Sequence, residues 1–345
     1  LLLSAGADPN QSVGSRWPPA SVAAPSSHPL SALYGAAGAN HDAEMTRMLL
    51  DAGADPNDGE SLYHSLEAGN ADIVQLLLDA GAEVEGTNAL YHALDFDDLP
   101  TFQTLLANAP TVDEPSMGPL LHWAINRRRS TAHVQAILAA GGHTEGAYIL
   151  ALRHGLSDVA VVLERGGLGV DVSAADRFVA ACARADAPHA RQLQAQHPEF
   201  PAALNAEQLQ MFPKLAEAGC ADAVCLMADL GWLLDLRGGD WDATALNHAV
   251  FRGDASLVEA LLKRGAQWTE THGFDDNACG TLSWASLNRP HPNGDWVGCA
   301  AALVTHGMPG ARRDPAHPET VLVGGERRMF SDDVTAFLLS VAAEP

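Results

Sequence analysis

The stretch SLYHSLEAGNADIVQLLLDAGAEVE, residues 61–85, decides the fold of this 345-residue chain. From Ile73 its apolar residues fall at i, i+1, i+3 and i+4, which places them on one face of a helix. A helix pair this short cannot bury that face by itself, so neighbouring units must cover it. Gly81 directly follows the helical pattern. Helices often end at a residue with left-handed backbone angles, and glycine adopts these most easily because it lacks Cβ.

The same turn recurs along the chain. LLLSAGADPN (residues 1–10) returns as LLDAGADPN (49–57), and a further strong copy is LLKRGA (261–266). Nine intervals between Gly6 and Gly307 give a mean spacing of about 33 residues. A second pattern, Leu followed three positions later by Ala or another small residue, precedes the turns, as in LYHA at 90–93. Each unit is therefore predicted to be two paired helices and a turn.

This pattern of T-P-L-H-x-A-A, glycine, D-I-V-x-L-L-L and G-A-D-x-N resembles the ankyrin-repeat family, and residues 61–85 match it most fully. The Ala-rich composition, with 18 Arg against 2 Lys, favours a bacterial-type member. The resemblance implies an all-α repeat solenoid, in which helix-turn-helix units stack, short extended turns join them and first helices line a concave side. The family's Thr-Pro and His are mostly absent here, and only His122 retains the His.

Six segments are expected from the repeat pattern. They are the end of a truncated repeat (1–10), a Pro/Ser-rich loop (11–29), regular repeats (30–166), degenerate repeats (167–230), Trp-rich repeats (231–309) and a C-terminal cap helix (310–345). Because Leu1 falls inside a repeat, we expect further sequence upstream. Whether that sequence includes a targeting segment is left open.

Composition narrows the classes of partner. The formal charge is −23, and residues 1–126 hold 17 acidic and two basic residues, which opposes binding to nucleic acid or to an anionic membrane. The acidic surface either attracts a protein with a basic surface or simply keeps the chain soluble.

The five cysteines form no C-x-x-C pair, so a reducing, cytoplasmic location is expected, without a regular zinc site or another cofactor.

Equivalent positions of successive first helices hold His and Trp side chains. These residues are His64, His92, Trp123, His248 and Trp284. Stacked repeats would align them in a column, and two interpretations remain open: a ligand-facing ladder for a protein partner, or side chains that fill the seam between helices. A metal site from His64 and His92 is disfavoured because no third ligand is indicated.

Tryptophan is concentrated near the C-terminal end, where five of the seven lie within residues 232–296. They alternate with turn-type polar segments, and aromatics near loop tips are typical binding anchors. The preferred protein-binding interface is therefore Trp241, Asp242, Phe274, Asp276 and Asn277. The alternative is that these enlarged loops pack on one another and protect the end of the stack.

No phosphate loop, G-x-S-x-G, H-E-x-x-H or dinucleotide fingerprint occurs in the sequence, so no catalytic residue is predicted. The leading hypothesis is a non-catalytic scaffold that binds another protein through its concave face and turn tips. The alternative hypothesis is an enzyme or small-molecule binder with its site in the His/Trp column or in the Trp-rich repeats.

Overall fold

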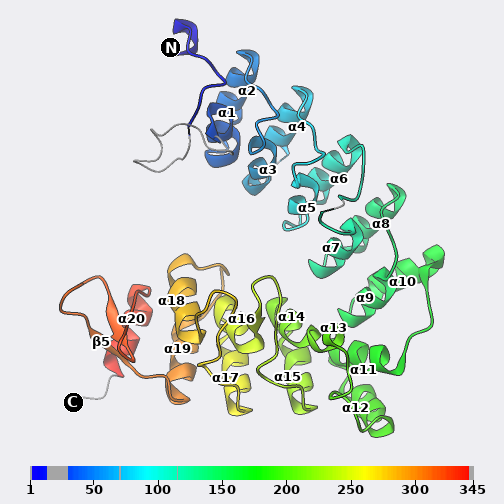
Figure 1. Cartoon of the computed structure of the whole chain (residues 1–345), viewed down its shortest axis with the longest axis vertical. Helices are drawn as coiled ribbons and strands as arrows, with labels where there is room; N and C mark the ends of the chain where they lie inside the picture. Colours follow the sequence, from blue (N-terminus) through cyan, green and yellow to red (C-terminus); the bar gives the residue numbers. More distant parts are fainter. Residues whose placement is uncertain (1, 14–29, 70, 115, 342–345) are drawn as a thin grey trace. The chain divides into compact units, whose positions relative to one another are not determined.

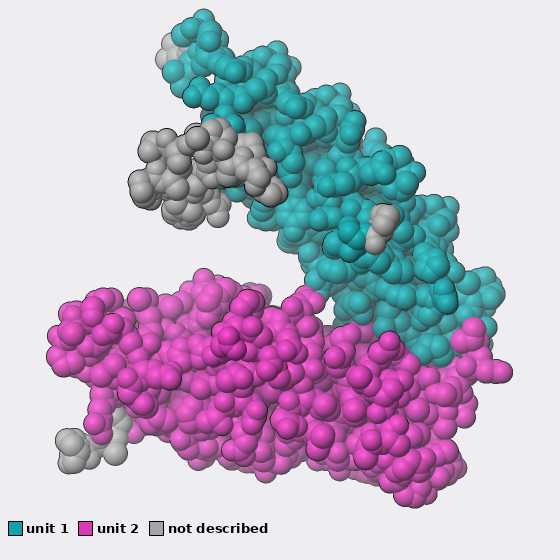
Figure 2. Space-filling view, in the orientation of Figure 1, with its two compact units in different colours: residues 1–150, 158–169 teal, residues 151–157, 170–345 magenta. Residues whose placement is uncertain are grey.

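The computed structural model describes residues 2–13, 30–69, 71–114 and 116–341. The chain divides into two compact units: unit 1 contains residues 1–150 and 158–169, and unit 2 contains residues 151–157 and 170–345 (Figure 2). Most of the expected Pro/Ser-rich loop, residues 14–29, lies outside the described residues. Among the loop residues that are described, Ser12–Val13 form strand β1, which pairs antiparallel with β2 (Leu30–Ser31) just after the loop.

Unit 1 consists of short helices that follow one another in pairs (Figure 1). The first helix of each pair is one of α1 (Ala32–Tyr34, continued by a π-helical turn over Gly35–Ala39), α3 (Ser61–Ser65), α5 (Ala89–Ala93) and α7 (Leu120–Asn126). The second helices are α2 (Ala43–Asp51), α4 (Asp72–Asp79), α6 (Leu99–Asn108) and α8 (Thr131–Ala139). Helices α9 (Ala147–Arg153) and α10 (Ser157–Leu163) each contain one sequence boundary between the units, and the third boundary follows residue 169.

Second helices stack on second helices, since α2 packs on α4, α4 on α6 and α6 on α8. Most of the apolar face that residues 61–85 predicted is covered: Ile73, Val74 and Leu77 are each at most 1% exposed, and Leu76 is half-buried. Gly81 ends α4 with φ of 96°, and the amide of Ala82 then donates to the carbonyl of Leu77 at 2.9 Å. The predicted left-handed glycine is thus present, and it allows the chain to leave the helix sharply.

An asparagine bridge joins consecutive turns of unit 1. The amide group of Asn57 donates to the carbonyl of Gly81 at 3.1 Å, and its side-chain oxygen accepts from the amide of Glu83 at 2.7 Å. Asn10 makes the equivalent pair of bonds to Gly53 at 3.0 Å and Asp55 at 2.7 Å. The last residue of the ADPN motif therefore hydrogen-bonds backbone groups of the next turn.

Unit 2 continues the alternation of first and second helices with longer connections. Its helices are α11 (Ala174–Ala183), α12 (Ala187–Gln196), α13 (Ala206–Leu209), α14 (Met211–Glu217), α15 (Ala221–Asp229), α16 (Ala245–Arg252), α17 (Ala255–Lys263), α18 (Ala278–Asn288), α19 (Trp296–Thr305) and α20 (Asp332–Ser340). Helix α14 packs on α16 and α16 on α18, while α15 packs on α17 and α17 on α19. A short hairpin, β3 (Arg237–Gly238) and β4 (Ala243–Thr244), precedes α16.

The degenerate segment 167–230 has a well-packed aromatic core. The ring of Phe178 on α11 stacks with Phe200 and with Trp232, with centroids 5.2 Å apart in both pairs. Phe178 is fully buried, and the other two rings are at most 8% exposed. These large rings pack alongside small buried residues of α11 such as Ala180 and Ala181.

The C-terminal segment 310–345 was expected to be a cap helix, but it also contains a sheet. Strands β5 (Ala311–Arg313), β6 (Val321–Val323) and β7 (Glu326–Arg328) form an antiparallel meander in the order β5-β6-β7, and α20 follows. Helix α20 packs on α19 and β5. The sheet forms because Gly324 and Gly325, both with positive φ, make a two-residue turn that folds β6 back on β7.

Across the four described stretches of the chain, no helix has both the length and the apolar character needed to cross a bilayer.

Candidate functional site: an aromatic pocket in unit 2

A pocket of about 520 Å³ opens on unit 2 beside helices α16 and α18. Its lining residues, here called the aromatic pocket, are Trp241, Phe251, His272, Phe274, Asp276, Gly280, Thr281 and Trp284. Most of the lining is aromatic, and Asp276 supplies the single carboxylate. A concave apolar site with a few polar groups is the usual form of a binding site.

Two loops form one side of the aromatic pocket. Trp241 lies between β3 and β4, and residues 272–276 lie between α17 and α18. The amide of Gly273 donates to the carbonyls of Trp241 at 3.2 Å and Asp242 at 3.1 Å, which ties the loops together. A Cβ on Gly273 would come within 2.8 Å of the Trp241 carbonyl, so this approach requires glycine.

The rings form one connected set, because Trp241 also contacts Phe251, with centroids 5.6 Å apart. Trp241 meets His248 and His272 edge to face, with centroids 4.7 and 4.9 Å apart. Phe251 and Trp284 are stacked, with centroids 5.4 Å apart and planes only 10° from parallel. These contacts fix the ring orientations before any ligand arrives, which lowers the entropic cost of binding.

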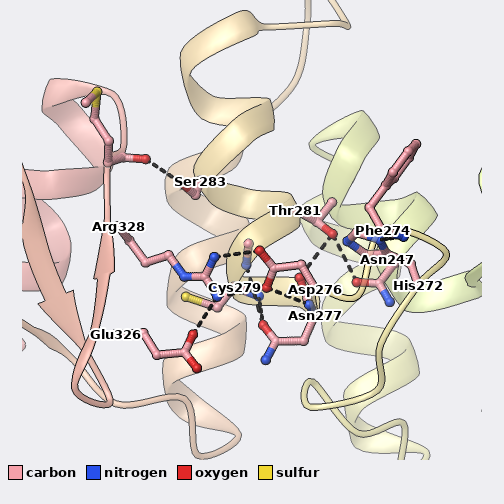
Figure 3. Close-up of polar contacts among 12 residues, drawn as sticks. Asn247, His272, Phe274, Asp276, Asn277, Cys279, Thr281, Ser283, Glu326 and Arg328 are labelled. Atoms are coloured by element: carbon pink, nitrogen blue, oxygen red, sulfur yellow. Dashed lines mark hydrogen bonds and ion pairs between the residues drawn. The ribbon is translucent and has the colours of Figure 1, made fainter.

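An ion pair to the C-terminal sheet holds the polar side of the aromatic pocket. Arg328 on β7 donates to both carboxylate oxygens of Asp276, at 2.5 and 2.8 Å, and also pairs with Glu326 at 2.6 Å (Figure 3). Ser283 on α18 donates to the carbonyl of Met329 at 2.5 Å. The sheet at the end of the chain thereby positions the loop that carries Phe274 and Asp276.

Two histidines are neutral at physiological pH because they are buried. Burial lowers the pKa of His248 to about 4, although its ring Nε2 lies 2.9 Å from the carbonyl of Gly238. Burial also lowers the pKa of His272, and this outweighs the nearby carboxylates of Asp276 and Asp275. His272 accepts from the amide of Phe274 at 3.2 Å through Nδ1, which a neutral ring can do.

The structure brings most residues predicted near the Trp-rich loops together. Trp241, Phe274, Asp276 and Trp284 line the aromatic pocket, and Phe274 and Trp284 are 76% and 52% exposed. Asp242 lies beside it, exposed and paired with Arg237 at 2.7 Å.

Two of the predicted contact residues make local contacts within the fold. His248 is 1% exposed, since its ring fills the space between α16 and the β3–β4 hairpin, so it cannot face a ligand directly. Asn277 is the N-cap of α18, and its side-chain oxygen accepts from the amide of Cys279 at 2.9 Å. The burial of His248 rules out direct contact by its ring, whereas the contact role of the half-buried Asn277 stays a prediction.

The predicted column in unit 1 forms a connected chain of side chains. His64 lies 2.8 Å from Glu67 through Nδ1 and 3.2 Å from Glu60 through Nε2. His92 stacks on Tyr63 with centroids 3.9 Å apart, and its Nδ1 lies 2.9 Å from Asp95.

Arg127 continues this chain to the predicted Trp123. It bonds Asp95 at 2.6 Å and lies 4.8 Å from the centre of the Trp123 ring. Burial would raise the pKa of Asp95, but the hydrogen bond from His92 and the charge of Arg127 outweigh it, and the pKa is lowered. Asp95 is therefore ionised and links the His and Trp positions of neighbouring first helices.

Phe251, His272 and Arg328 were not predicted as site residues. Arg328 is 52 residues from Asp276 in sequence, and no local pattern joins them. Phe251 lies one turn after His248 on α16, so helical spacing was the one signal that pointed to it.

The described residues offer little catalytic chemistry. No group of three or more His, Cys, Asp or Glu among them is arranged to hold a metal ion. Burial raises the pKa of Cys182 to about 12 and that of Cys279 to about 11, so these thiols do not form reactive thiolates. The Asp276 carboxylate is engaged by Arg328 on both oxygens.

The Asp276–Arg328 pair leads to a prediction about Gly280. Alanine normally stabilises a helix by about 1 kcal/mol relative to glycine. At Gly280 a Cβ would overlap the Asp276 carboxylate, so we expect Gly280→Ala to lower the free energy of unfolding by about 1 kcal/mol instead. Urea unfolding of the full chain measures this change.

Gly35 is the matched control, because it has helical φ and a Cβ there meets nothing within 4 Å. Gly35→Ala should leave stability unchanged or increased. In an Arg328→Met background the Gly280→Ala penalty should shrink, since the carboxylate can then move aside. Stabilisation by Gly280→Ala in the wild-type background would refute the tight fit.

The family comparison agrees with the helix pairs of unit 1. The family model of ankyrin repeats (3 copies) matches residues 33–116. Similar solved structures include the human ASB11 ankyrin repeat domain, at 20% identity and a TM-score of 0.30, covering 64% of this chain and 99% of that chain. Another is the ankyrin repeat domain of Bcl-3, a unique member of the IkappaB protein family, at 17% identity and a TM-score of 0.33, covering 72% and 96%.

No curated protein matches the sequence. The family match and the stacked helix pairs confirm the all-α repeat solenoid predicted from the sequence.

Proposed function

We propose that this chain, whose residues 33–116 match the ankyrin-repeat family model, is a non-catalytic scaffold that binds another protein through the aromatic pocket of unit 2. Ankyrin repeats are generally protein–protein interaction modules. The observation that carries the proposal is the exposure of Phe274 and Trp284 beside a preformed apolar pocket. Large apolar rings that remain open to water on a folded protein commonly mark a binding surface.

The first helices of unit 1 supply a second proposed contact surface, on the side that the family resemblance makes concave. His64, His92 and Trp123 are partly exposed there, among the carboxylates of Glu60, Glu67 and Asp95. Negative charge at this surface favours a partner with a basic surface and disfavours nucleic acid. The proposal also includes a cytoplasmic location, because all five cysteines are free thiols and a reducing compartment keeps thiols free.

The geometry of the aromatic pocket supports binding over catalysis. Its one carboxylate is held in an ion pair, and its one histidine is neutral and accepts from a backbone amide. Neither group is paired with a nucleophile among the residues that line the pocket. A protein side chain inserted between the rings needs none of this chemistry.

Phe274→Ala tests the proposal. We expect the variant to lose partner binding by at least about tenfold, because truncating an exposed aromatic anchor typically costs 2 kcal/mol or more. The measurement is quantitative affinity purification with the full chain from its own cells, followed by titration of the recovered partner. Leu233→Ala is the matched control, since Leu233 is also an exposed apolar residue of unit 2, at 64%, and lies outside the pocket.

Equal recovery of the partner by the wild type and Phe274→Ala would remove the aromatic pocket from the interface. Stabilisation of the wild type by a small metabolite, lost in Phe274→Ala, would favour the small-molecule alternative instead.

A further inference from the structure

The aromatic pocket combines ring faces with negative charge. Four of its lining residues are Phe or Trp, and its single formally charged lining residue is Asp276. Aromatic faces carry negative electrostatic potential and attract organic cations, and Trp does so most strongly.

No cationic lining residue competes for these rings. His272 is neutral at physiological pH because its burial lowers its pKa. Arg328, the nearest guanidinium to Asp276, does not line the aromatic pocket and is held by both Asp276 and Glu326. The rings are therefore open to a cation from outside the chain.

Asp275 supplies an exposed carboxylate next to two lining residues in the chain, Phe274 and Asp276. Its charge acts on His272, as does the opposite charge of Arg237, and Arg237 is itself paired with Asp242 at 2.7 Å. Among the described residues its carboxylate takes part in no ion pair, whereas Asp276 is bound on both oxygens. With a net charge of −23, the whole chain also attracts cationic partners over a long range.

We propose that the aromatic pocket receives an arginine side chain of the partner protein, with the guanidinium against the ring faces and its charge compensated by Asp275. The planar guanidinium stacks on aromatic rings and presents N–H donors at its edge, which a lysine ammonium cannot do at the same time. This inference rests on the proposed function and specifies the partner chemistry at the same site.

Two peptides test the charge requirement: acetyl-Gly-Gly-Arg-Gly-Gly-amide and the same peptide with citrulline. Citrulline keeps the shape of arginine but is neutral. The readout is the NMR signal of the indole N–H groups of Trp241 and Trp284 in the full chain, assigned with Trp241→Phe and Trp284→Phe. At equal ionic strength we expect saturable shifts of both signals, with about tenfold tighter binding of the arginine peptide.

Asp275→Asn removes the negative charge of the Asp275 carboxylate with little risk to the fold. Asp275 has φ of 58°, and asparagine tolerates this left-handed conformation as well as aspartate does. We expect about threefold weaker binding of the arginine peptide and unchanged binding of the citrulline peptide. Asp171→Asn makes the same charge change at an exposed residue of unit 2 that does not line the pocket, and it should leave both affinities unchanged.

Equal affinity for the two peptides would overturn the inference, as would an absence of shifts with either peptide. An Asp275→Asn variant that behaves like Asp171→Asn would also overturn it. Failure here is distinguishable from failure of the proposed function: a natural partner lost in Phe274→Ala but indifferent to Asp275→Asn would keep the interface and remove the arginine.

Discussion

The Phe178→Ala variant is expected to lose about 4 kcal/mol in free energy of unfolding. The Phe178 ring is fully buried and stacks with Phe200 and Trp232, so truncation removes both contacts and leaves a cavity that rigid neighbours cannot fill. This loss is expected in the least regular part of the sequence, where the repeat pattern gives no indication of a critical residue.

Urea unfolding of the full chain, followed by tryptophan fluorescence and circular dichroism, measures the effect. Val170→Ala is a suitable control because Val170 is 58% exposed in the same unit, and it should change stability by less than about 0.5 kcal/mol. A loss below about 1 kcal/mol for Phe178→Ala would mean that the three rings do not form a tightly packed core.

Acidification is expected to destabilise the protein through His248. Its pKa is about 4 in the folded chain and near 6.5 when unfolded, so the unfolded state binds a proton first as the pH falls. The full stabilisation is present above pH 6.5 and declines between pH 6.5 and 4. At pH 5 this single group should cost about 2 kcal/mol relative to pH 7.5.

His248→Gln isolates this contribution, because glutamine has no titratable ring. The difference in stability between pH 7.5 and pH 5 should be about 2 kcal/mol smaller in the variant than in the wild type. Identical pH profiles for the wild type and His248→Gln would show that the ring is hydrated in solution.

The repeat architecture was predictable because its signals are local. A glycine at the end of a helix and an apolar face at helical spacing are determined by a few neighbouring residues, as Ile73 and Gly81 illustrate. The sheet after residue 310 was missed because its strands have three residues each, too few for an alternating pattern to stand out.

The candidate site was predictable in part. Phe274 and Trp284 were predicted as contact residues from aromatic clustering and repeat register, and both line the pocket. The burial of His248 agrees with the alternative that column side chains fill the seam between helices, although the repeat position alone does not show that the β3–β4 hairpin covers it. Arg328 could not be assigned either, because its pairing with Asp276 depends on how the C-terminal sheet folds back.

The asparagine bridge between consecutive turns bears on how such a chain can lengthen. Asn57 fits the carbonyl of Gly81 and the amide of Glu83 only if one complete helix pair lies between them. The number of residues in that interval is not fixed, because Asn57 reaches Gly81 across 24 residues and Asn10 makes the same bridge to Gly53 across 43. Evolutionary growth of the regular part is therefore expected to proceed in whole modules of one helix pair each. Insertions inside a module are expected only where they leave its two turns in place, as the longer interval after Asn10 does.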